Sequence, residues 1–477
     1  MSYNSEDYFL SNDFKAILKN FEEADDNERY TSLDPDELVD IAEYYYNNGD
    51  TGKAEEIVNN VISFYPGNPA PLLFKARMAL IESHDIPKAE HYAEQIEDKT
   101  DLEYFYIKAE IMLVEKQAAR ADMYLEDKFA EIDEDDKDYF TIDSAALFLD
   151  YNETDIAEKW LKRCYDKESV DYKEQSARIS LEKGDYEKSK KLFNELIDKD
   201  PYSTQYWNSL ASSQFFSNNI EDSIQSSEYS IAINPKNSVA LLNKANGLYN
   251  LGNYGEALKY YLRYNELCPD DENGEMLIGF CCMLLEKYEL AIKHLEKAEK
   301  LLPPQATSLI DVYKDWAFSL CRLGRLKEAM AILDKTESLD CDHNDMLVYR
   351  GNLLAGCGLL AEARTYFIQA LTNSGYSPNI LMKIAITVFE SGDSNYAYKI
   401  FKTLYDIHKD WKKGYAYFAA CCYDLGKTDE FMQCLKTATG HSPKELQMLL
   451  GKLFPEGMKP EDYYKYMLDK IKKEGKI

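Results

Sequence analysis

Two glycine-containing segments have the residue types of phosphate-binding loops. The segment from Cys421 to Thr428 ends in Gly-Lys-Thr, as a nucleotide-binding loop does, but a cysteine stands where that loop requires its first glycine. Gly356-x-Gly358-x-x-Ala361 has the spacing of a dinucleotide-binding turn, yet it follows a predicted helix rather than a strand. We therefore interpret both segments as turns between helices.

Candidate metal ligands and catalytic residues also lack the spacing that their chemistry requires. The acidic run from Glu131 to Asp138 alternates carboxylates, but it has neither the central glycine nor the closing glutamate of a calcium loop. Cys341 and His343 have no second pair at zinc-site spacing. The six histidines are scattered, and none belongs to a catalytic motif. We predict no catalytic residue, no metal site and no cofactor.

The composition favours a helical protein without a membrane segment. Of 477 residues, 45% are hydrophobic and 29% are charged, and no apolar stretch reaches the ~18 residues of a membrane span. The first residues lack the basic and apolar regions of a secretory signal, so we expect a cytoplasmic protein. The ten cysteines show no disulfide-framework spacing, which predicts free, mostly buried thiols in a reducing compartment.

Charge is distributed unevenly along the chain. The 85 acidic and 55 basic residues give a net charge of -30, which repels a phosphate backbone and argues against nucleic acid as a partner. Residues 1–140 hold 35 acidic and 13 basic residues, whereas residues 272–477 hold 28 and 27. We interpret the acidic N-terminal third mainly as a solvated helix surface. The alternative is that it binds a basic partner.

A period of 34 residues organises the chain. Four prolines follow it without a break: Pro201, Pro235, Pro269 and Pro303. Small residues recur with nearly the same spacing and predict twelve units over residues 35–442. They are Ala42, Ala76, Ala109, Ala145, Ala177, Ala211, Ala245, Gly279, Ala317, Gly351, Ala385 and Ala419.

Each unit is predicted to contain two helices. Within residues 238–271, one apolar stripe surrounds Ala245 and a second surrounds Ala257, with a turn at Gly252 between them. A small residue on each helix lets two antiparallel helices approach closely. A glycine at the turn can adopt the positive φ with which one helix ends and the chain reverses.

On these residues the chain resembles the tetratricopeptide repeats. The family's signature positions are occupied by Trp207-x-x-Leu210-Ala211, Gly252-x-Tyr254-x-x-Ala257, Tyr261 and Pro269. The resemblance implies an all-α, right-handed superhelical solenoid of about twelve antiparallel helix pairs. The sixth repeat departs from the family, with Asn218 at the turn and Ser223, Ser227 and Ser230 at packing positions, so we expect looser packing there.

The two ends are predicted to cap the solenoid. Residues 1–34 contain an acidic segment with an amphipathic helix around Phe14, whose N-cap is expected at Asn12 or Asp13. Residues 443–477 contain two apolar stripes that predict two further capping helices. Terminal repeats need such covers because they would otherwise expose an apolar face to water.

The resemblance also implies which residues meet a ligand. In this family, the second, fifth, ninth, twelfth and thirteenth positions of each first helix line the concave groove. Aromatic, methionine and amide side chains at these positions suit a polypeptide segment. The predicted peptide-binding residues are Asn208, Phe215, Asn246, Tyr249, Asn250, Phe280, Met283, Phe318, Arg322 and Asn352.

We therefore predict a non-enzymatic scaffold or adaptor that binds a protein or peptide in its groove. The carboxylate clamp of chaperone-binding relatives is absent as a set, since Lys314 has Phe318 rather than asparagine as its companion. Two alternatives stay open. One is a regulatory sensor for a small signalling peptide or a nucleotide, and the other is an enzyme whose site spans several repeats.

Overall fold

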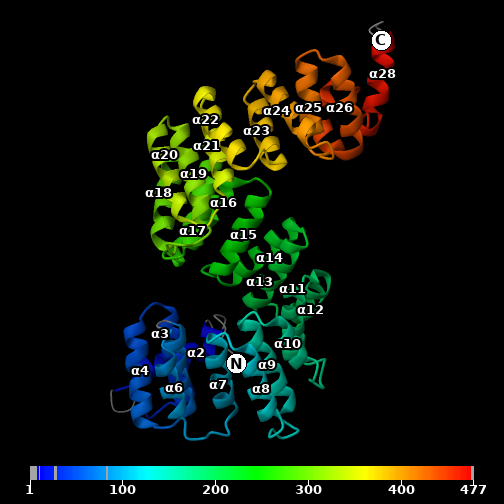
Figure 1. Ribbon diagram of the computed structural model, residues 1–477. Helices are drawn as coiled ribbons and strands as arrows, with labels where there is room; N and C mark the ends of the chain where they lie inside the picture. The colour runs from blue at the N-terminus through cyan, green and yellow to red at the C-terminus, as the bar shows by residue number, and fades with distance from the viewer. Residues whose placement is uncertain (1–7, 10, 26–28, 82–83, 474–477) are drawn as a thin grey trace. The chain divides into compact units, whose positions relative to one another are not determined.

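The chain folds into helices throughout the part that is described. The computed structural model describes residues 8–9, 11–25, 29–81 and 84–473 (Figure 1). Across these ranges the helices run from α2 to α28, and no β-strand occurs. The all-α prediction is confirmed, and successive helices pair as a helical-repeat solenoid requires.

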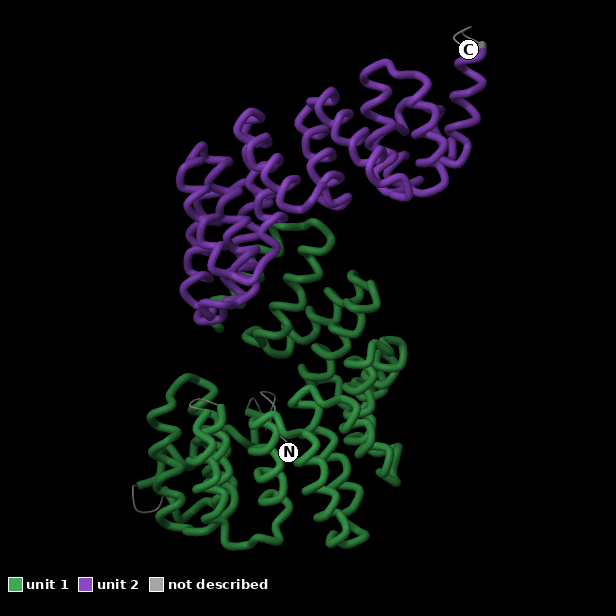
Figure 2. The backbone as a smooth tube through the Cα atoms, viewed as in Figure 1, with its two compact units in different colours: residues 1–268 green, residues 269–477 purple. Residues whose placement is uncertain are grey.

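Residues 1–268 form an N-terminal unit (Figure 2). The lone helix α2 (Asn12–Glu23) precedes seven helix pairs, which we number as repeats one to seven. They are α3 (Pro35–Asn47) with α4 (Thr51–Phe64), α5 (Pro69–Ile81) with α6 (Ile86–Glu94), α7 (Leu102–Val114) with α8 (Ala118–Phe129), α9 (Lys137–Asp150) with α10 (Thr154–Leu161), α11 (Val170–Glu182) with α12 (Tyr186–Lys199), α13 (Thr204–Phe216) with α14 (Ile220–Ile233), and α15 (Ser238–Asn250) with α16 (Tyr254–Leu267).

Residues 269–477 form a C-terminal unit, a division that the sequence did not predict. It contains repeats eight to twelve, followed by α27 (Pro443–Leu450) and α28 (Tyr463–Lys473). Short 3-10 turns occupy Lys335–Ser338, Gly451–Leu453 and Pro460–Asp462. The five pairs are α17 (Glu272–Leu284) with α18 (Tyr288–Leu301), α19 (Leu309–Arg322) with α20 (Leu326–Asp334), α21 (His343–Gly356) with α22 (Leu360–Asn373), α23 (Pro378–Glu390) with α24 (Ser394–Ile407), and α25 (Tyr415–Asp424) with α26 (Thr428–His441).

The turn within each pair has one residue in the left-handed region. Glycine fills this position in seven repeats, including Gly358 (φ 79°) and Gly426 (φ 67°), which belong to the two segments that resemble phosphate-binding loops. Those segments are therefore helix-to-helix turns, as predicted. In the other repeats a residue with a side chain adopts the same conformation, for example Asn218 at φ 64°. The backbone geometry of the repeat thus persists where the glycine is lost.

The small residues lie where paired helices meet. Every alanine of the 34-residue series is 0% exposed. At Gly279, an added Cβ would lie 2.8 Å from the side chain of Leu295 on the partner helix. The small side chains are therefore required by close helix packing, as the sequence indicated.

The sixth repeat corrects one expectation. Ser223, Ser227 and Ser230 are fully buried, and α13 and α14 contact each other as extensively as the helices of the other pairs do. The Ser223 hydroxyl donates to the Ala211 carbonyl at 2.8 Å, and the Ser227 hydroxyl donates to the Ser223 carbonyl at 2.8 Å. The prediction of looser packing is wrong, because small hydroxyl side chains let the helices approach and satisfy their own polar atoms.

The end helices bury apolar side chains against their neighbours. Phe14 and Phe21 of α2 pack into the core of the first repeat. The N-cap of α2 is Ser11, whose side chain accepts from the Phe14 amide at 3.1 Å, and not Asn12 or Asp13 as predicted. None of the helices described is both long enough and apolar enough to cross a bilayer.

Candidate peptide-binding surface

The predicted binding residues are divided between the two units, which we describe separately. In the N-terminal unit, Asn208 is only 8% exposed, and its side-chain amide donates to the Asn237 side chain at 3.0 Å. The Asn246 side chain accepts a hydrogen bond from the Tyr261 hydroxyl at 2.7 Å. Contrary to the prediction, these two amides hold neighbouring helices together, because buried polar atoms in the helix contacts need partners.

The other predicted residues of the N-terminal unit are more accessible. Phe215 on α13 and Tyr249 on α15 are half-buried, and Asn250 is exposed. The Phe215 ring lies 5.7 Å from Phe216, and the Tyr249 ring lies 5.3 Å from Tyr254. These aromatic pairs leave ring faces in contact with solvent on the first-helix side of repeats six and seven.

In the C-terminal unit, the predicted residues lie on three successive first helices. Phe280 and Met283 on α17 are half-buried, and Phe280 packs against the apolar core that includes Trp316 and Leu320. Phe318 and Arg322 lie one turn apart on α19, and Asn352 lies on α21. The last three residues are the ones that the structure brings together.

Phe318, Arg322 and Asn352 line a cavity of about 200 Å³ between α19 and α21, which we call the α19–α21 cleft. Three of the ten predicted residues thus share one cavity. Its other walls are Cys321, Tyr349, Leu353, Gly356 and Cys357.

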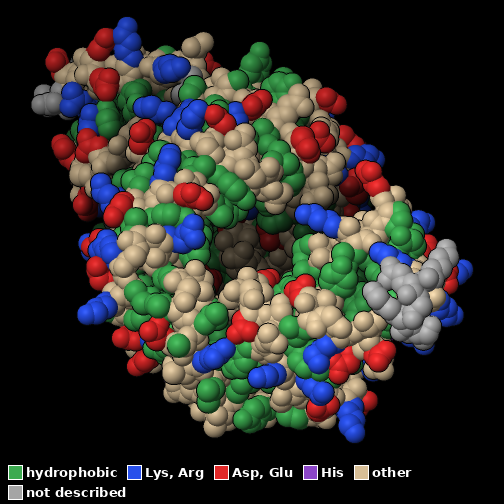
Figure 3. All heavy atoms as spheres, turned by 90° about the horizontal axis from the view of Figure 1, so that it is seen from above, with side chains coloured by type: hydrophobic (Ala, Val, Ile, Leu, Met, Phe, Trp, Pro, Cys, Tyr) green, Lys and Arg blue, Asp and Glu red, His purple; other side chains and the backbone are tan. Residues whose placement is uncertain are grey.

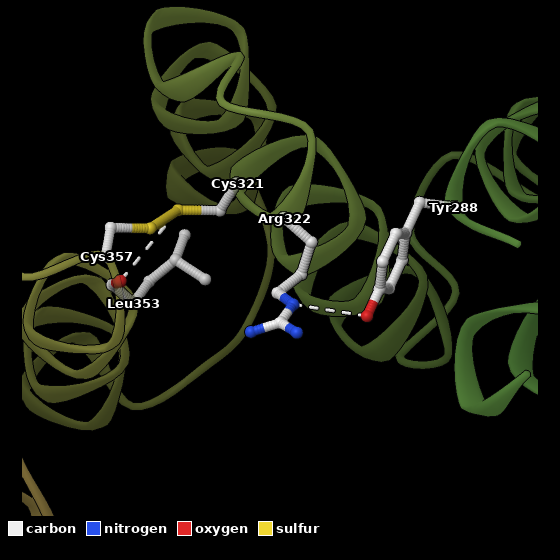
Figure 4. Close-up of a disulfide and its surroundings, with 5 residues drawn as sticks. All are labelled: Tyr288, Cys321, Arg322, Leu353 and Cys357. Atoms are coloured by element: carbon white, nitrogen blue, oxygen red, sulfur yellow. Dashed lines mark hydrogen bonds between the residues drawn. A yellow bond between two sulfur atoms is a disulfide. The ribbon is translucent and has the colours of Figure 1, made fainter. Parts of the chain in front are cut away.

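One end of this cleft carries a positive charge with a fixed position. The Arg322 guanidinium donates through Nε to the Tyr288 hydroxyl at 3.1 Å, and the Tyr288 ring lies 6.4 Å from the Phe318 ring (Figure 4). Arg322 itself is exposed. Tyr288 therefore orients the guanidinium while its two terminal nitrogens stay accessible to a ligand.

The middle of the cleft carries an amide oxygen without a partner. Oδ1 of Asn352 is buried and makes no hydrogen bond. The Tyr349 hydroxyl, by contrast, donates to the Lys314 carbonyl at 2.8 Å and fixes its ring against α19. An unsatisfied buried acceptor costs about 1–3 kcal/mol, so a ligand that donates to Asn352 would recover this free energy.

A disulfide closes the cleft on one side. Cys321 at the end of α19 is bonded to Cys357, the C-cap of α21, and their Cα atoms are 7.0 Å apart (Figure 4). The prediction that all ten cysteines are free is therefore wrong for this pair. The two residues come together because both stand at the ends of first helices in adjacent repeats. The other eight cysteines are free thiols.

A second cleft, here called the acidic cleft, lies on the first helices of repeats one to three. Its volume is about 450 Å³, and Val39, Leu73 and Phe74 are among its apolar walls. Arg77 is its one basic residue and pairs with Glu103 at 3.5 Å and with Glu110 at 3.3 Å. The acidic residues of its lining are Asp36, Asp40, Glu43, Asp101 and Glu103.

Burial raises the pKa of several of these carboxyl groups. The pKa of Glu43 rises to about 7, mainly through burial and secondly through the Asp40 carboxylate, while Arg77 opposes the shift. Burial likewise raises the pKa of Asp36 and Glu103. Arg77 thus does not compensate the carboxylates fully, and the cleft keeps an excess of negative charge at neutral pH.

The charge of the surface does not by itself mark either cleft. On the face shown in Figure 3, acidic and basic side chains are interspersed, with hydrophobic side chains between them. Across the described residues, no group of three or more His, Cys, Asp or Glu side chains could hold a metal ion. The clefts are therefore distinguished by their lining residues.

Comparison with known proteins agrees with the helix-pair geometry. The tetratricopeptide repeat family matches residues 239–271, which contain α15 and α16. These residues lie in register with the 34-residue series that continues through the other repeats. Residues 239–271 therefore form a tetratricopeptide repeat.

The similarities to other proteins are partial. Human protein O-mannosyl-transferase TMTC3 is 26% identical over 181 residues, which is 35% of this chain and 20% of the relative, so the match spans about a fifth of that protein. A solved structure of MamA from Desulfovibrio magneticus RS-1 has a TM-score of 0.34 at 17% identity over 37% of this chain and 98% of that one. MamA AMB-1 has a TM-score of 0.32 at 21% identity over 35% and 97%.

The sequence did not predict several residues of the α19–α21 cleft. Tyr288 begins a second helix, and Tyr349 lies outside the family's ligand positions, so neither was considered. Cys321 and Cys357 are 36 residues apart, close to one repeat length. This spacing was a usable signal, because residues one period apart stand at similar places on neighbouring repeats.

Proposed function

We propose that the protein is a non-enzymatic, cytoplasmic scaffold that binds a polypeptide segment in the α19–α21 cleft. The observation that carries this proposal is the unpaired Oδ1 of Asn352 beside the accessible guanidinium of Arg322. A peptide offers complementary groups in close succession, since a backbone amide can donate to Asn352 and a carboxylate or carbonyl can accept from Arg322.

The size and walls of the cleft support a peptide side chain as the anchor. A cavity of about 200 Å³ accommodates one large apolar side chain rather than a whole cofactor. Phe318 and Tyr349 present aromatic walls to it. Aromatic residues in a partly desolvated pocket are the usual source of binding free energy at protein interfaces.

The alternatives receive less support from these residues. A nucleotide would place several phosphate charges near the single arginine of the cleft, and its lining contains no lysine. TMTC3 is named as a mannosyl-transferase, but the match covers 20% of it. We infer that the two proteins share repeats and propose no transferase activity for this chain.

We also propose a basic partner for the acidic cleft of the N-terminal unit. Five acidic side chains and one arginine surround an apolar floor there. Lysine or arginine side chains of a partner would compensate the carboxylates, and its apolar side chains would cover Val39 and Leu73.

The main proposal is tested by selecting peptides from a random display library on the full-length protein and measuring their affinity by fluorescence polarisation. Binding should be lost in Phe318→Ser and kept in Ile368→Ser, because Ile368 is an exposed apolar residue on the second helix of repeat ten. Equal loss in both variants, or in neither, would place the site elsewhere.

A further inference from the structure

We propose that the bond between Cys321 and Cys357 is a redox-sensitive clamp that fixes the shape of the α19–α21 cleft. The inference rests on the proposed function only in taking this cleft as the peptide site. The bond itself, the junction that it crosses and the exposure of its sulfurs are features of the C-terminal unit alone.

The clamp lies at the junction where adjacent repeats touch least. Within the C-terminal unit, first helices normally pack along the next first helix, or second helices along the next first helix. Between repeats nine and ten, neither α19 nor α20 makes comparably extensive contact with α21. A covalent bond at this place therefore restrains a movement that packing restrains weakly.

The polar links of the α21 side chains across the junction lie before the last turn of α21, where Leu353 packs against the core of repeat nine. The Tyr349 hydroxyl donates to the Lys314 carbonyl, and Arg350 pairs with Asp334 at 2.7 Å. Both links lie in the middle of α21, about two turns before Cys357. Without the disulfide, the last turn of α21 could move away from α19 about these two links.

That last turn forms a wall of the cleft. Asn352, Leu353, Gly356 and Cys357 all line the cavity, and they follow Tyr349 directly on α21. A movement of this turn changes the distance between Asn352 and Arg322, the two polar groups proposed to hold the peptide. The oxidised pair therefore holds the binding geometry, and reduction releases it.

The accessibility of the two sulfurs fits thiol–disulfide exchange. Cys357 is exposed, whereas Cys321 is only 7% exposed, so an external thiolate reaches the sulfur of Cys357 first. That attack forms a mixed disulfide with Cys357 and releases the thiolate of Cys321, which takes up a proton. A second external thiol then attacks the mixed disulfide, releasing Cys357 as a thiol. The two external thiols supply the two electrons that reduce the bond, and they leave joined to each other by a disulfide.

The remaining cysteines argue that this pair has a regulatory rather than a general structural role. The other eight stay free, including the adjacent pairs Cys281–Cys282 and Cys421–Cys422. In a reducing compartment, disulfides in such proteins are usually transient and redox-sensing. A single accessible bond at a binding cleft has the placement that such a switch requires.

The test compares the full chain in oxidised and reduced glutathione. Titration of thiols in denaturant should give eight in the oxidised protein and ten in the reduced one, because eight cysteines are free and two are paired. Hydrogen exchange of the amides at the end of α21 should become about tenfold faster on reduction, as expected when a local restraint is lost. Cys341→Ser, which removes a free thiol of the same repeat junction, should keep the difference.

The variant Cys321→Ser/Cys357→Ser should exchange at the fast rate in both buffers. Ten thiols in the oxidised wild type, or equal exchange rates in the two buffers, would overturn the proposal. Neither measurement needs a peptide, so failure of the clamp and failure of the peptide site are distinguishable. For a peptide selected on the oxidised protein, reduction should weaken binding about tenfold while Ile368→Ser leaves it unchanged.

Discussion

Both clefts are formed by the same helix-pair backbone. They differ in the charged and polar side chains that line them. Both lie between first helices of successive repeats. In the acidic cleft, five carboxyl groups face one arginine, and burial raises the pKa of Glu43. In the α19–α21 cleft, one amide oxygen and one guanidinium are available. The repeat therefore fixes where a ligand lies, and individual side chains decide its chemistry.

Position within the repeat explains this division of roles. Glu43 occupies the first-helix position of repeat one that corresponds to Phe318 in repeat nine and Asn352 in repeat ten, because each follows the small residue of the 34-residue series by one. The residues that build the helix pair, such as Ala42 and Ala317, are alike in both regions and fully buried. Ligand chemistry can thus vary without affecting helix packing.

Removal of the aromatic wall of the α19–α21 cleft should have the largest effect. Phe318→Ser should weaken a selected peptide about 30-fold, near 2 kcal/mol, because an aromatic anchor in a desolvated pocket is a typical hot spot. Fluorescence polarisation measures this, and Ile368→Ser is the matched control. Binding of a basic decalysine peptide to the acidic cleft should be unchanged in Phe318→Ser. A parallel loss of both ligands would mean that the two clefts are not independent.

Removal of carboxylates from the acidic cleft should weaken ligand binding to that cleft alone. Asp36→Asn/Glu43→Gln should weaken decalysine binding about tenfold at pH 8 and low salt, where Glu43 is mostly ionised, because two partly buried carboxylates are lost. The same affinity should fall as salt rises, over the ~10 Å screening length at 0.1 M. Asp133→Asn/Glu134→Gln removes two charges from outside the cleft and is the control. Equal weakening by both double variants would show that the effect comes from the overall net charge of the protein.

The fold could be predicted to a large extent because packing imposes a period on the sequence. Ala245 and Ala257 must be small where α15 meets α16, and this constraint recurs in each repeat. The turn positions could also be predicted from the sequence, and Asn218 adopts the same positive φ as the turn glycines. The serines of repeat six misled the prediction, because hydrogen bonds to backbone carbonyls are invisible in a hydrophobicity pattern.

The site could be predicted only in part. Family positions selected Phe318, Arg322 and Asn352, which line one cleft, but they also selected Asn208, whose amide is hydrogen-bonded inside the fold. The sequence pattern shows on which side of a helix a residue lies, but it does not show which neighbouring group hydrogen-bonds to its side chain. The pairing of Cys321 with Cys357 also depended on spatial proximity at one junction.

The carboxyl groups of the acidic cleft should make stability depend on pH. Burial raises the pKa of Glu43 in the folded state to about 7 from its ordinary value of 4.5, so the folded state holds the proton where the unfolded state has lost it. Stability from this group is complete below about pH 4.5 and is lost as pH rises through 7. Asp36 and Asp40 on α3, Arg77 on α5 and Glu103 on α7 share the cleft.

Glu43→Gln should therefore remove about 2 kcal/mol of the decrease in unfolding free energy between pH 5 and pH 8. Urea denaturation at the two pH values measures this, and Glu134→Gln, outside the cleft, is the control. A decrease of the same size in Glu43→Gln and in the wild type would show that Glu43 does not titrate in this window.

The smallest expected effect is that of a variant in the α19–α21 cleft that makes the fold more stable but weakens peptide binding. Asn352 has a buried amide oxygen without a partner, and leucine has a similar volume without that polar atom. Asn352→Leu should thus raise the free energy of unfolding by about 0.5 kcal/mol, part of the cost of an unsatisfied buried acceptor. The same variant should bind the selected peptide more weakly, because the acceptor for a backbone amide is lost. Asn250→Leu, at an exposed first-helix position in the other unit, should change neither quantity by as much. A loss of stability in Asn352→Leu would show that the amide already has a partner in solution, and the peptide would then need another anchor.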